Sequence, residues 1–83
     1  MATADEWVRR YAERLGIDPP DPTAVEVLLA MTGVAAHASE RTAAPISAWL
    51  AGLAGVSPAE AAEHARALAA DLASEAAAGS EPG

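Results

Sequence analysis

Helix-start and helix-stop signals divide this chain into four segments. Thr3 and Glu6 have the spacing of a capping box, and Gly16 suits the left-handed residue that ends a helix. The run 18–22, Asp-Pro-Pro-Asp-Pro, cannot be helical inside because prolines lack amide donors and restrict the residues before them. A further start signal, Ser-Pro-Ala-Glu at 57–60, combines an N-cap serine with proline at the first helical position. Strand signals are weak, since period-2 alternation is absent.

Apolar residues recur at helical spacing within these segments. The main stripes are formed by Trp7, Val8, Tyr11 and Leu15; by Ile46, Trp49, Leu50 and Leu53; and by Ala61, Ala65, Leu68 and Leu72. The second segment, about 23–40, is apolar nearly all round, which is typical of a central helix. We predict an all-α fold, a compact bundle of four helices with short loops. It forms one domain over residues 1–83, with an ordered core at about 4–74 and a frayed end at 75–83.

Polar side chains interrupt the apolar sequence between residues 36 and 45. His37, Glu40 and Arg41 stand three and four residues apart, so on a helix they share one face. We expect this patch in the last turn of the second helix, at the edge of the core. One interpretation is a structural lock, in which cationic side chains stabilise the exposed carbonyls at the helix end and Arg41 fastens the following turn.

A second interpretation of the patch is a binding site. Gly33 lies one turn before His37, and small residues let a ligand or another backbone approach closely. An imidazole and a guanidinium beside such a groove could hold an anionic or hydrogen-bonding group. The third interpretation is a solvated face without a role. The candidate binding residues are His37, Glu40, Arg41, Gly33 and Trp49. Trp49, like Trp7, fits a core position, and it becomes an interaction anchor if it is half exposed.

Composition excludes several classes of function. Without cysteine the chain has no thiolate nucleophile and no zinc–thiolate site. No nucleophile lies beside a base, and the spacing of histidines and carboxylates lacks the pattern of a helical-bundle metal site, so we expect no catalytic residue, metal or cofactor. The net charge of −7 disfavours nucleic acid and anionic membranes as partners. Lacking a signal peptide and a membrane-length apolar run, the chain is predicted to be cytoplasmic.

The run from Trp7 to Leu72 resembles a small actinobacterial domain family of unknown function. The matching features are Trp7, Ala36-His37, Glu40-Arg41, Ala44-Pro45, and Leu50 with Gly52. Members of that family are often labelled molybdopterin-guanine dinucleotide biosynthesis proteins, and occur beside or fused to domains resembling the molybdenum cofactor guanylyltransferase. The resemblance implies an accessory domain that acts beside such an enzyme. It carries over His37, Glu40 and Arg41 as a candidate binding or structural motif.

These observations favour a non-catalytic helical interaction domain with a protein partner, which the resemblance places beside a nucleotidyltransferase of molybdenum cofactor biosynthesis. Two alternatives stay open: a small-ligand-binding domain that uses the His37/Arg41 patch, and a structural homodimer. A chain of 83 residues is near the lower limit for a self-sufficient core, and it hides only about 60–65% of its unfolded surface. Burial against a partner or a second copy would therefore add stability.

Overall fold

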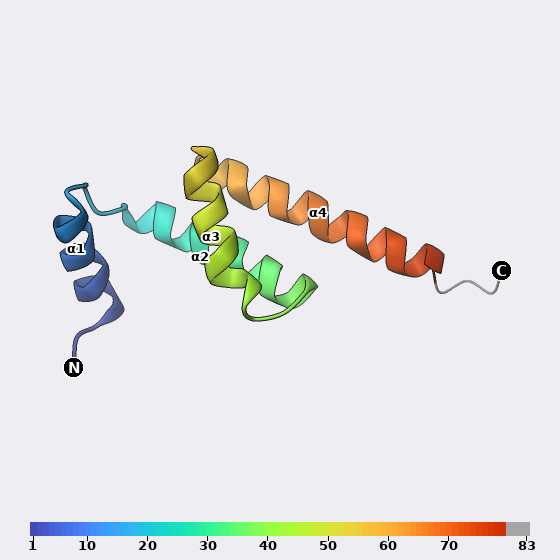
Figure 1. Cartoon of the computed structure of the whole chain (residues 1–83), viewed down its shortest axis with the longest axis horizontal. Coiled ribbons are helices and arrows are strands. Elements are labelled where there is room, and N and C mark those ends of the chain that lie inside the picture. The colour runs from blue at the N-terminus through green and yellow to red at the C-terminus, as the bar shows by residue number, and fades with distance from the viewer. Residues whose placement is uncertain (80–83) are drawn as a thin grey trace.

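The computed structural model describes residues 1–79, and over this range the chain forms four helices and no strand (Figure 1). The helices are α1 (Ala4–Leu15), α2 (Pro22–Ala38), α3 (Ala43–Ala54) and α4 (Pro58–Gly79). The predicted all-α fold of four helices is confirmed. α4 continues past residue 74 to Gly79, and the rest of the predicted frayed end, residues 80–83, lies outside the described residues.

Side-chain caps fix where three of the helices begin. In each case a side-chain oxygen accepts a hydrogen bond from the amide three residues later: Thr3 from Glu6 at 3.1 Å, Asp21 from Ala24 at 2.8 Å, and Ser57 from Glu60 at 3.2 Å. Such bonds satisfy amides that have no partner within the helix. α3 differs, because its N-cap residue Thr42 makes no side-chain cap hydrogen bond.

This difference between caps gives a matched pair of variants. We expect Asp21→Ala to lower the free energy of unfolding by about 1 kcal/mol, because the amide of Ala24 loses its partner at the start of α2. Thr42→Ala is the control, since its side chain makes no such bond, and we expect a smaller loss there. Urea unfolding followed by circular dichroism measures both. Equal losses in the two variants would contradict the cap interpretation.

The packed part of the molecule is built on α2, which packs against both α3 and α4. Its buried cluster consists of Met31 from α2 with Ala61 and Ala62 from α4, and partly buried neighbours surround it: Val27, Leu28, Ala51, Val56 and Ala65. The partly buried face of α3 carries small residues, including Ser47 and Ala51. Small side chains allow a close approach of helices, and they leave the bulkier residues of α3 on its other faces.

α1 stands apart from α3 and α4 in Figure 1 and is joined to the start of α2 by the proline-containing segment. The radius of gyration is 15.6 Å, whereas about 12 Å is expected for a globular domain of this length. The accessible surface is 6609 Å², against about 4,600 Å² expected for a folded monomer of this mass. The structure thus exposes about 2,000 Å² more than a closed domain would.

Much of this surface is apolar, which corrects one expectation from the sequence. Trp7 and Trp49 were expected to fit core positions, but they are 65% and 70% exposed. Other large side chains of the expected stripes are exposed as well, namely Val8, Tyr11, Leu15, Ile46, Leu50, Leu53, Leu68 and Leu72. The reasons are geometric: no helix covers α1, and α3 turns its small residues inward.

Candidate functional site

The predicted polar patch does not lie on one helical face. α2 ends at Ala38, so only His37 belongs to the helix, while Glu40 and Arg41 lie in the turn before α3. Ser39 ends the helix: its hydroxyl donates to the carbonyl of Ala35 at 2.7 Å, and its backbone leaves the helical conformation. A serine that bonds to the backbone in this way competes with continuation of the helix. The prediction that the three residues share a face is therefore wrong.

The three side chains are also exposed and separate. Within residues 1–79, no hydrogen bond or ion pair joins the side chains of His37, Glu40 and Arg41; the ion pair in this range is Arg10–Glu6 on α1. The backbone does stabilise the turn, since the carbonyls of Glu40 and Arg41 accept hydrogen bonds from the amides three residues later. This geometry gives no support to a side-chain lock at the end of α2.

Gly33 lies in the interior of α2 and is partly buried. A Cβ atom built on it would meet no other atom within 4 Å, so no neighbouring backbone approaches α2 at this glycine. Glu40 instead borders a shallow hollow with Ser39, Thr42, Ala43 and Ile46. The surface around Glu40 therefore joins the first turn of α3, and Gly33 is not part of it.

An exposed apolar ridge runs along α3. We define the α3 ridge as Ile46, Trp49 and Leu53, which are spaced three and four residues apart and are all more than half exposed. Trp49 and Leu53 border a hollow with Ala48 and Gly52. Glu40 borders a hollow with Ile46, so the ridge has an apolar centre and a polar residue at one edge, as protein–protein interfaces do. Of the predicted site residues, Glu40 and Trp49 thus line the two hollows that border this ridge.

A second apolar surface was not predicted from the sequence. We call it the apolar groove: a hollow of about 400 Å³ between α2, α3 and α4. It is lined by Met31, Ala35, Ser47, Leu50, Ala51, Ala54, Val56, Ala61, His64, Ala65 and Leu68. Its floor is made of small side chains and its edges of Leu50 and Leu68, which are both more than half exposed. The apolar stripe with Ala61, Ala65 and Leu68 supplied one wall of this groove in the sequence, but the sequence did not show that the stripe stays uncovered.

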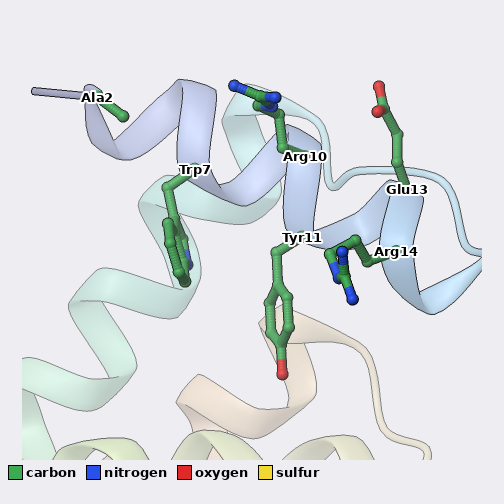
Figure 2. A pocket seen from close by; sticks show the side chains of 6 residues that line it. All are labelled: Ala2, Trp7, Arg10, Tyr11, Glu13 and Arg14. Atoms are coloured by element: carbon green, nitrogen blue, oxygen red, sulfur yellow. The ribbon is translucent and has the colours of Figure 1, made fainter.

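α1 presents a third apolar surface. Figure 2 shows Trp7 and Tyr11 pointing to the same side of the helix, while Arg10 and Glu13 point away from that side. The ring centroids are 6.0 Å apart with an interplanar angle of 31°, within the range of favourable aromatic pairs. Leu15 continues the spacing of four residues, and we call Trp7, Tyr11 and Leu15 the aromatic face of α1.

The segment between α1 and α2 is short and stiff. The amide of Ile17 donates to the carbonyl of Ala12 at 3.0 Å, so the chain is fixed to the end of α1 as far as residue 17. Asp21 belongs to the start of α2 as its N-cap. Only residues 18–20, Asp-Pro-Pro, lie between the two caps, and each is restricted by its own ring or by the proline after it.

The described residues limit the chemistry in two further ways. No group of three or more histidine, aspartate or glutamate side chains within residues 1–79 could hold a metal ion. In the same part of the chain, no helix combines the length and the apolarity needed to cross a bilayer.

The fold and its surfaces define a small all-α domain that exposes three apolar surfaces. The chain belongs to a family described as a domain of unknown function (DUF6457), whose match covers residues 1–82. No curated protein and no solved structure matches the chain. The family membership thus covers nearly the whole chain and brings no activity with it.

Proposed function

We propose that this protein is a non-catalytic interaction domain that binds a nucleotidyltransferase of molybdenum cofactor biosynthesis through the α3 ridge and its polar edge. The observation that carries the interaction part is the exposure of Ile46, Trp49 and Leu53 on one face of α3. Contiguous exposed apolar side chains with a polar edge mark sites of protein interaction. The identity of the partner is taken from the sequence resemblance, and the cytoplasm is the compartment that we propose for the complex.

Trp49 is the anchor of this interface in our proposal. Tryptophan is enriched among the residues that dominate binding energy, because it buries a large area at little entropic cost. Arg41 is exposed in the turn before α3, and in our proposal its guanidinium pairs with a carboxylate of the partner. Glu40 borders the hollow that includes Ile46, and in our proposal it contributes orientation more than affinity.

The proposal is tested with the purified full chain and a purified molybdenum cofactor guanylyltransferase in a calorimetric titration. We expect binding at tens of micromolar or tighter, the range in which weak specific contacts are measurable. Trp49→Ala is expected to weaken binding by about 10–100-fold, and Arg41→Ala by a smaller factor, with helicity unchanged in both.

Trp7→Ala is the matched control, because Trp7 is an equally exposed tryptophan on a different helix. It should leave the affinity for the nucleotidyltransferase unchanged. No heat of binding at these concentrations, or an equal loss with Trp7→Ala and Trp49→Ala, would contradict the proposed interface.

A further inference from the structure

We propose that α1 of each copy packs into the apolar groove of a second copy, so that the protein forms a dimer by reciprocal exchange of α1. The exchange puts the aromatic face of one chain against Leu50 and Leu68 of the other. It goes beyond the proposed binding of a nucleotidyltransferase and uses different residues.

The dimensions of the two surfaces agree. Along α1, the aromatic face spans the nine residues from Trp7 to Leu15, or about 12 Å of helix. Along α4, the groove spans the eight residues from Ala61 to Leu68, or about 10 Å. An amphipathic helix laid into an apolar groove is a recurrent mode of recognition, with anchors spaced three and four residues apart.

The linker decides in favour of a second copy over closure within one chain. For α1 to fold back antiparallel along its own α2, the chain would have to reverse direction within residues 18–20. These residues are held extended by Pro19 and Pro20, and the caps on both sides are hydrogen-bonded. Fold-back would therefore require a reversal in residues whose extended backbone the prolines favour. Short, restricted hinge segments favour exchange of an element between copies.

Charge is compatible with α1 as the occupant of the groove. Residues 17–79 contain eight carboxylates and two arginines, whereas in α1 the three arginines are balanced by three carboxylates, Asp5, Glu6 and Glu13. Exchange therefore places an electrically neutral helix, and not a second acidic one, against the acidic part of the partner copy.

The exposed area of the whole chain leaves room for such contacts. Each copy exposes about 2,000 Å² more than a closed domain of its mass, spread over all of its surfaces, while a standard interface buries about 800 Å² per partner. Because the exchange is reciprocal, two identical contacts form around one two-fold axis. The α3 ridge stays outside these contacts and is free for the other partner.

Sedimentation equilibrium of the full chain, from about 1 µM to a few hundred micromolar, tests the proposal. We expect a monomer–dimer equilibrium. Tyr11→Ala and Leu68→Asp should each raise the dimer dissociation constant at least tenfold, as expected for interface anchors. Both residues are exposed in the structure, so the variants should keep their helicity. Trp49→Ala, on the α3 ridge, is the control and should leave the dimer intact.

A mixing experiment distinguishes exchange from closure within one chain. One variant, Trp7→Ala with Tyr11→Ala, keeps only its groove; the other, Leu50→Asp with Leu68→Asp, keeps only its α1. Each should be monomeric alone, and the mixture should form a dimer through the one intact contact. A wild-type monomer at every concentration, or a dimer unaffected by these variants, would overturn the proposal. Either result leaves the nucleotidyltransferase titration unaffected, so the two proposals fail separately.

Discussion

Met31→Ala is expected to lower the free energy of unfolding by about 2–5 kcal/mol, a large part of the total stability of a domain this small. Met31 is only 2% exposed and is the largest side chain of the buried cluster; the other members are alanines. Truncation removes its transfer free energy and leaves a cavity that alanine neighbours cannot fill. Chemical denaturation monitored by circular dichroism measures the loss.

Leu29→Ala is the control for this variant. Leu29 lies on the same helix, two residues before Met31, but it is 67% exposed and contributes little burial. We expect a change of no more than about 0.5 kcal/mol, the usual range for surface substitutions. If the two variants lost equal stability, the cluster around Met31 would not be the core of the domain.

Ala62→Leu is expected to destabilise by about 1–3 kcal/mol for the opposite reason. Ala62 is 1% exposed and belongs to the same cluster as Met31, so three added carbon atoms force α2 and α4 apart. The same substitution at Ala67, an exposed position of α4, is the control and should be close to neutral. The measurement is again urea unfolding, at matched protein concentration.

The double variant Met31→Ala with Ala62→Leu tests whether the side chains at positions 31 and 62 occupy the same part of the core. If the added leucine fills the volume that methionine left, the double variant should be more stable than the sum of the single losses predicts. Simple additivity would mean that the two side chains pack in separate places.

The helix boundaries were predictable because they are decided by neighbours in the sequence. The hydroxyls of Thr3 and Ser57 each accept a hydrogen bond from the amide three residues later. The end of α2 was placed two residues too late for the same local reason, since the hydroxyl of Ser39 bonds to the carbonyl of Ala35. The spacing of His37, Glu40 and Arg41 could not reveal that the Ser39 side chain bonds to the helix backbone.

The surfaces were less predictable because they depend on how helices meet. α3 is apolar on most of its circumference, so its sequence does not say whether Trp49 or Ala51 faces α2. The structure turns Ala51 inward and Trp49 outward. The position of α1 likewise depends on two prolines that restrict the linker. They influence the direction in which α1 leaves α2, and hydrophobic periodicity carries no information about that direction. Trp49 was expected to fit a core position, and its exposure is the reason that it serves as the anchor in the proposed interface.

The small interior of this domain has a consequence for the life of the protein in a cell. Over the described residues only Ala12, Met31, Ala61 and Ala62 are buried, so an isolated copy has little free energy separating it from forms that proteases degrade. A binding partner present at a hundred times its dissociation constant adds about 2.7 kcal/mol to that separation. If the proposed contacts form, we expect unbound copies to be cleared first, so that the amount of this protein follows the supply of the molecules that cover it.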